Sequence, residues 1–335
     1  METEKSVKLT AAELSQIWSG YQNDTMLKCV LQYFRETVED PDIQLIVEHA
    51  LNLSMSHIEK LTAIFDKEAH PLPVGFTDSD VDLNAPRLYS DPFILYYLHQ
   101  AGKLGINAMS VAVALSTRSD IYAYFSECLS EYVHLHKKTT DVLLSKGLYI
   151  RSPHLPTPKG ANFVKQKNFL SGFGEKRPLV SLEVTNLFDN IQRNALGAST
   201  VMGFAQVARS KKVAQYMVDG KEIAEKHVEI FGSELRKDDL NVPISWAIEV
   251  TDSTVPPFSD KLMMFHTTAL ISIGMGYYGT SMATAFRSDL IADYARLLAE
   301  IAKYSGEGAK LLIENGWLEE PPQAADRDEL VKQKK

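Results

Sequence analysis

The second half of this chain repeats the first at an offset of about 170 residues, and this duplication limits the folds that the chain can adopt. Without a gap, the offset pairs identical residues: Glu13 with Glu183, Gln22 with Gln192, Phe34 with Phe204, His57 with His227, Glu59 with Glu229, Pro73 with Pro243, and Asp82 with Asp252. After one deletion, an offset of 169 aligns Arg118 with Arg287, Glu131 with Glu300, and Gly147 with Gly316. The 335 residues also exceed the usual size of one domain. The sequence therefore predicts two copies of one fold.

Each copy has the pattern of four helices. Apolar residues recur at spacings of three and four, which is the period of an amphipathic helix. In the first copy we expect helices over residues 11–38 and 41–65, a third that starts after Ser90, and a fourth that starts after Thr117 or Ser119 and ends at Lys146. In the second copy we expect helices over residues 182–208, 212–235, 259–286 and 288–315.

The connections between these helices alternate between short and long. A few residues join helices one and two, and likewise three and four, whereas about twenty residues separate helices two and three. Short links predict antiparallel hairpins, and a link of about twenty residues can run the length of a helix. The predicted fold is all-α, with two tandem ferritin-like four-helix bundles that each cross over between helices two and three.

Proline and glycine mark the domain boundaries. They are frequent over residues 151–178, which predicts a linker between the copies. We expect the first bundle over residues 8–150, the second over 179–322, and a charged flexible tail over 323–335.

Charge and cysteine content exclude several classes of protein. A net charge of -8 argues against a nucleic-acid partner, which would require a basic surface. The two cysteines, Cys29 and Cys128, align with Ser199 and Leu297, so neither a structural disulfide nor a cysteine metal site is expected. No apolar stretch follows the charged N-terminus, and we expect a cytoplasmic protein.

Two further motifs that both copies share resemble those of a known family. They are the Arg-Ser-Asp turns at Arg118 and Arg287 and the helix endings 143–148 and 311–317. With the tandem arrangement, these motifs resemble the domain of unknown function 3231 family over almost the whole chain. The resemblance implies ferritin-like bundles, an origin in endospore-forming bacteria, and a relation to the spore coat protein F group. It implies no established reaction.

A ferritin-like fold raises the hypothesis of a di-metal site. Such a site needs a glutamate from each of two helices and a Glu-x-x-His pair from each of the other two. The sequence has one such pair, Glu131 and His134, and it aligns with Glu300 and Lys303. The set is incomplete in both copies, so we expect neither a metal nor another cofactor, with Glu131 and His134 as weak candidates.

The repeated polar residues predict contacts inside the bundles. Antiparallel pairing of helices one and two places Gln22 opposite His57, and Gln192 opposite His227, which predicts two buried hydrogen bonds or a ligand contact. Crossover topology brings the starts of helices one and four together. We therefore expect an ion pair there in each copy, between Glu13 and Arg118 and between Glu183 and Arg287.

The third helix of the second copy is unusually apolar. No charged residue lies between Lys261 and Arg287, and the length would permit a membrane span. Scattered polar residues, including His266, favour a buried helix that is covered by the other copy or by a second subunit. Glycine, methionine and the tyrosines Tyr277 and Tyr278 in this segment also suit an apolar ligand cleft.

Together these patterns predict a structural or interaction protein without assigned catalysis, associated with sporulation or the spore coat through the resemblance. Its expected partners are other proteins or further copies of itself, and no membrane span is expected. The alternative is a ferritin-like metal or redox protein, or one that binds an apolar small ligand.

Overall fold

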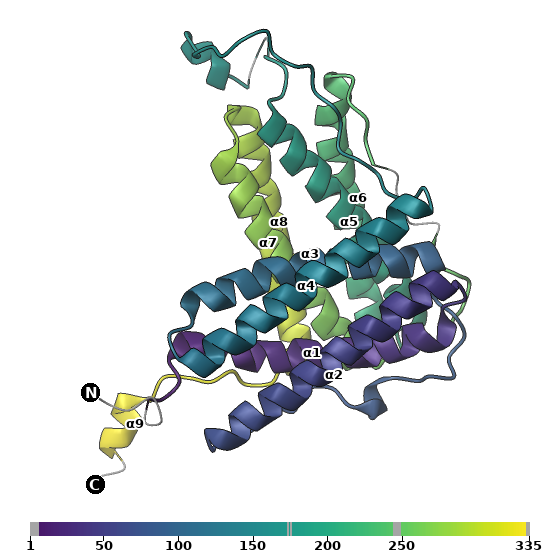
Figure 1. Cartoon of the computed structure of the whole chain (residues 1–335), viewed down its shortest axis with the longest axis vertical. Coiled ribbons are helices and arrows are strands. Elements are labelled where there is room, and N and C mark those ends of the chain that lie inside the picture. Colours follow the sequence, from purple (N-terminus) through teal and green to yellow (C-terminus); the bar gives the residue numbers. More distant parts are fainter. Residues whose placement is uncertain (1–6, 173, 175, 244–248, 333–335) are drawn as a thin grey trace.

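The computed structural model describes residues 7–172, 174, 176–243 and 249–332 (Figure 1). Residues 1–6, on which the absence of a signal segment was predicted, and the end of the predicted tail, 333–335, lie outside these ranges. In the described residues the regular secondary structure is helical. Two isolated β-bridges are present, and no β-strand extends beyond them. This confirms the predicted all-α fold with a duplicated bundle.

The first half contains four long helices whose limits follow local signals. They are α1 (Ala11–Thr37), α2 (Pro41–Lys67), α3 (Asp91–Leu115) and α4 (Ser119–Ser145). A capping box between Thr10 and Glu13 starts α1, and the Asp40 side chain caps α2 ahead of a proline at its first position. Ser90 caps α3, as predicted.

The second half repeats this order with α5 (Ser181–Val207), α6 (Lys211–Lys237), α7 (Asp260–Thr284) and α8 (Ser288–Glu314). Short helices η2 (Asp78–Asp80), η3 (Lys167–Leu170) and α9 (Arg327–Lys332) lie in the connections and the tail. The helices of this half run steeply across those of the first half in Figure 1. Within each half the first two helices pack together, as do the last two, which is the pairing that the short links predicted.

The two long connections lie against each other. Val81 forms an antiparallel bridge with Phe258, and Tyr89 forms one with Val250. Between them, the Asp82 N–H donates to the Pro257 carbonyl at 2.8 Å. The connections thus fasten the two halves together through backbone hydrogen bonds.

The largest hydrophobic core belongs to both halves. It includes α1, α2 and α3 side chains from the first copy and side chains from α5, α6 and α7 of the second. The Tyr97 ring lies edge-on to Phe34 at 5.3 Å and stacks with the His266 imidazole of α7 at 5.6 Å. Smaller cores occupy the far end of each bundle. The first copy therefore covers the N-terminal part of α7, which contains His266.

The segment after α8 returns to the first half. Its Glu319 carboxylate accepts hydrogen bonds from the Gln22 side chain at 2.7 Å and from the Val74 backbone at 2.9 Å. This end of the predicted second bundle thus contacts α1 and the first long connection. Across the described residues, no helix is both long and apolar enough to cross a membrane.

Candidate functional site

The starts of α4 and α8 are held by the glutamates that the repeat aligns. Glu13 Oε1 accepts hydrogen bonds from the backbone N–H groups of Thr117 at 2.9 Å and Arg118 at 2.8 Å, and Oε2 accepts from the Thr10 N–H at 2.8 Å. Burial by itself would raise the pKa of Glu13, but these hydrogen bonds outweigh it and lower the pKa to about 2. A buried carboxylate thereby satisfies two backbone N–H groups immediately before α4 and places a negative charge at the start of that helix.

The expected side-chain ion pairs between these glutamates and arginines were wrong in detail. The residues meet at the predicted end of the bundle, but the Arg118 guanidinium binds Glu68 and Asp120, both at 2.7 Å. In the second half, Glu183 Oε1 accepts from the Arg287 N–H at 3.0 Å. The Arg287 guanidinium binds Glu234 and Asp289, both at 2.6 Å.

The same arrangement corrects the predicted cap of α4. The N-cap residue is Arg118, without a side-chain cap, rather than Thr117 or Ser119. A carboxylate from α1 instead accepts from the N–H groups of the N-cap residue Arg118 and of Thr117 before it. This contact depends on the packing of two helices and has no local sequence signal.

A histidine is buried at the centre of each bundle. His57 of α2 and His227 of α6 are 1% and 0% exposed. The predicted glutamine partners were wrong, because Gln22 turns to Glu319 and the partly buried Gln192 is not among the hydrogen-bond partners of His227. The aligned glutamates of the fourth helices take this role: His57 Nε2 lies 2.7 Å from Glu131, and His227 Nε2 lies 3.0 Å from Glu300.

The other side of each imidazole differs between the copies. His57 Nδ1 lies 3.3 Å from the buried Asp24 carboxylate of α1. Burial would lower the pKa of His57, but hydrogen bonds with Asp24, Cys128 and Glu131 raise it to about 12. Burial conversely raises the pKa of Asp24. The first bundle therefore contains an imidazolium between two carboxylates.

The second bundle keeps the histidine but not its charge. His227 Nδ1 lies 2.9 Å from the Tyr278 hydroxyl, and that hydroxyl accepts from Asn194, the counterpart of Asp24, at 2.8 Å. Burial lowers the pKa of His227 in spite of the hydrogen bond to Glu300. This imidazole is neutral at neutral pH, so the two copies have diverged at one position of the fold.

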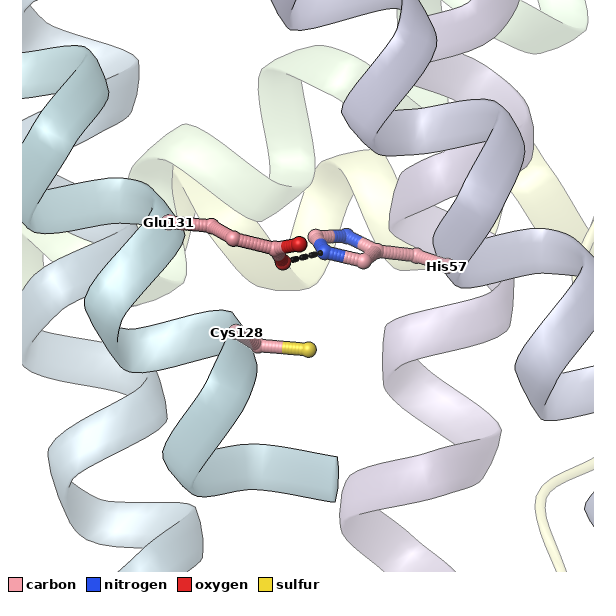
Figure 2. A group of neighbouring side chains, drawn as sticks. All are labelled: His57, Cys128 and Glu131. Carbon is pink, nitrogen blue, oxygen red and sulfur yellow. Dashed lines mark hydrogen bonds and ion pairs between the residues drawn. The ribbon is translucent and has the colours of Figure 1, made fainter. Parts of the chain in front are cut away.

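The weak metal candidates of the sequence do not meet. His134 is exposed on α4, whereas the partly buried Glu131 turns toward His57 and Cys128 (Figure 2). The Cys128 thiol, which the sequence did not predict as a ligand, points toward the same space from the preceding turn of α4. The potential ligand atoms of these three residues all lie within 4.8 Å of one another.

A cavity of about 320 Å³ lies between the two halves. Its walls come from α1 and α3 of the first half and from α5, α6 and α7 of the second, and most of the lining is apolar. His266 and Tyr278 of the predicted cleft line it. Tyr277 does not line it, but the guanidinium carbon of the lining residue Arg193 lies 3.6 Å from the centre of the Tyr277 ring.

Three buried polar atoms of this lining lack a hydrogen bond among the described residues: Gln100 Oε1, Arg193 Nε and His266 Nδ1. The other ring nitrogen of His266 lies 2.7 Å from the Tyr97 hydroxyl, and burial lowers the pKa of His266 to about 4. A buried polar atom without a partner is costly, and protein interiors contain few of them. The cavity thus combines an apolar wall with three unsatisfied polar atoms, two on neutral side chains and one on the Arg193 guanidinium.

Comparison with known proteins identifies the family of this chain. The model of the family described as "Protein of unknown function (DUF3231)" matches residues 1–160 and 167–330. No curated protein matches the chain. A solved structure titled as a putative spore coat protein from Bacillus halodurans C-125 is 19% identical, with a TM-score of 0.42, and the match covers 46% of this chain and 100% of that one.

Proposed function

The chain belongs to this family of proteins of unknown function, and we propose that it is a binding protein without catalysis that holds a neutral, mainly apolar small molecule between its two bundles. The observation that carries the proposal is the cavity between the halves, where Gln100 and His266 present unpaired polar atoms beside an apolar wall.

The dimensions and lining of the cavity support a small ligand. About 320 Å³ falls in the range of small-molecule pockets, which are mostly apolar with a few polar groups that orient the ligand. The carbonyl oxygen of Gln100 can accept a hydrogen bond, and the free ring nitrogen of His266 can donate or accept, depending on the tautomer. A hydroxyl or amide on the ligand would satisfy both.

The charges around the cavity favour a neutral ligand. Each of the two charged residues in its lining already lies beside an opposite charge: Asp24 contacts His57 at 3.3 Å, and Arg193 Nε, although it makes no hydrogen bond, lies 3.5 Å from Asp189. A ligand with a net charge would find no free counterion among these groups, and burial of an unpaired charge is expensive.

A neutral fluorescent dye, N-phenyl-1-naphthylamine, tests the proposal. We expect the full chain to bind one dye per chain with enhanced emission, and long-chain alcohols to displace it better than fatty acids of equal length. The critical variant is Gly274→Leu, because Gly274 lines the cavity and has open space where a side chain would extend. Leucine also favours the helix over glycine, so the variant fills the cavity without weakening α7.

The matched control is Gly276→Leu, two residues along the same helix, where the glycine is exposed and also has open space. The proposal predicts that the dye signal is lost in Gly274→Leu and kept in Gly276→Leu. Equal binding by both variants, or no dye binding by the unmodified chain, would refute it.

The remaining predictions from the sequence and from the family resemblance stay proposals. They are an association with sporulation or the spore coat, a cytoplasmic location, self-association or other protein partners, and the ferritin-like relationship of the bundles. A fluorescent fusion followed through sporulation tests the first. A uniform signal in vegetative cells, with none at the forespore, would contradict that prediction.

A further inference from the structure

We propose that His57, Cys128 and Glu131 of the first bundle form a binding site for one divalent metal ion of the zinc type. The three residues belong to two facing helices, α2 and α4, and their potential ligand atoms lie within 4.8 Å of one another (Figure 2). No other group of three such residues converges in this way within the described ranges. The inference does not depend on the cavity ligand.

The local structure explains why the ligands converge. Cys128 and Glu131 are three residues apart on α4 and therefore share a face of the helix. His57 lies opposite them on α2 and directs Nε2 toward the Glu131 carboxylate. Imidazole nitrogen, thiolate sulfur and carboxylate oxygen are the donors that Zn²⁺ takes in proteins.

A metal would displace one proton from His57 Nε2 and one from the Cys128 thiol, both released to solvent, and would move the nitrogen and oxygen ligands apart. A tetrahedral ion with bonds of about 2.1 Å separates its nitrogen and oxygen ligands by about 3.4 Å. His57 Nε2 and Glu131 Oε2 are 2.7 Å apart, so they would have to separate by about 0.7 Å. The Glu131 side chain is 23% exposed and can move outward, and its exposure also provides an entry route.

The residue behind the histidine also fits a metal site. Metal-binding histidines usually donate their second ring N–H to a carboxylate or carbonyl, which fixes the tautomer and orients the ring. Asp24 stands in this position, because its Oδ1 lies 3.3 Å from His57 Nδ1 and the carboxylate is buried. With Nδ1 held by Asp24, Nε2 faces Glu131 and would coordinate an ion by giving up the proton that it shares with Glu131.

The second bundle provides an internal comparison. It keeps the histidine and the glutamate, as His227 and Glu300, but has Leu297 in place of the cysteine and Asn194 in place of the aspartate. The ligand set is therefore complete in one copy only. We expect one ion per chain, with a fourth coordination position open to water or another ligand, as in zinc sites with three protein ligands.

Cobalt titration of the metal-free full chain tests the site. Co²⁺ replaces Zn²⁺ in such sites, and a thiolate bound to it gives an intense near-ultraviolet band. We expect this band to saturate at one Co²⁺ per chain and to disappear when Zn²⁺ is added. Cys128→Ser should abolish the band, and Glu131→Gln should weaken the affinity at least tenfold.

The other cysteine supplies the matched control. Cys29 is also buried, but its thiol contacts the Thr77 carbonyl, outside the cluster, so Cys29→Ser should keep the band. No thiolate band in the unmodified chain, or a band that survives in Cys128→Ser, would overturn the assignment. In that case the cluster is an ion triad in which two carboxylates bind the His57 imidazolium.

A variant that gains a second metal site gives a test that loss of folding cannot imitate. The double substitution Asn194→Asp and Leu297→Cys copies the ligand set into the second bundle. The proposal predicts that the cobalt stoichiometry then rises from one to two per chain. A stoichiometry that stays at one would contradict the assignment of Asp24 and Cys128, whatever happens to the Cys128→Ser variant.

Discussion

The buried carboxylate of Glu13 offers a quantitative test of how the bundle ends are held. Glutamine at this position keeps the shape of the side chain but removes the charge and replaces one acceptor oxygen with an amide donor. That donor would face either the N–H groups of Thr117 and Arg118 or those of Thr10. Glu13→Gln therefore leaves N–H groups without an acceptor in a buried place.

The magnitude follows from the pKa. Hydrogen bonds lower the pKa of Glu13 from the ordinary 4.5 to about 2, a difference of about 2.5 pH units. At 1.36 kcal/mol per unit, this difference corresponds to about 3 kcal/mol of stability at pH 7. Because the folded-state pKa lies below the unfolded value, the contribution is complete above pH 4.5 and declines as the pH falls toward 2. About half of it should remain at pH 3.

The assay is urea unfolding followed by far-ultraviolet circular dichroism at pH 7 and at pH 3. We expect Glu13→Gln to lower the free energy of unfolding by about 3 kcal/mol at pH 7, and by about half as much at pH 3. Glu59→Gln is the control, because Glu59 is exposed on α2, and it should change stability by less than about 0.5 kcal/mol. A loss below about 1 kcal/mol, or a loss that is the same at both pH values, would refute the reasoning.

Two further predictions concern the glycines of the helices and the buried His266. Gly220 and Gly308 lie against the hydroxyl groups of the stacked rings of Tyr304 and Tyr216, so Gly220→Ala should lower thermal stability by about 1–3 kcal/mol. Gly276→Ala should raise the stability by up to about 1 kcal/mol. Calorimetry compares the two variants, and an equal change in stability for both would contradict this account. Burial lowers the pKa of His266 to about 4, so the unfolded chain takes up a proton first as the pH falls below 6.5. Between pH 7 and pH 5 this should cost about 2 kcal/mol of unfolding free energy, and a His266→Gln chain with the same pH dependence would show that the imidazole is not responsible.

The helix ends were predictable because their signals are local. Proline after Asp40, the hydroxyl of Ser90 and the glycines after α4 and α8 act within a turn of their own helix. The contact that anchors the start of α4 was not predictable, since the acceptor of the Arg118 N–H is Glu13, more than a hundred residues away. The predicted crossover between helices two and three did place the glutamate and the arginine correctly at one end of each bundle.

The partners of His57 show where sequence reasoning fails. Antiparallel pairing placed Gln22 opposite the histidine, but Asp24 occupies that position. Two residues correspond to about 200° around a helix, so a small error in register selects the opposite face. The sequence did contain a signal, a carboxylate among the apolar residues of α1, that the comparison of identical residues passed over because Asp24 aligns with Asn194.

The sequence by itself determined the duplication, the helix limits and the alternation of short and long links, because these depend on local propensity and on the period of apolar residues. Only the tertiary structure decided how the halves cross, that they share one core, and that a cavity remains between them. These features depend on how two irregular surfaces pack, which no single helix specifies. For the same reason, the His57 cluster became visible only when α2 and α4 lay side by side.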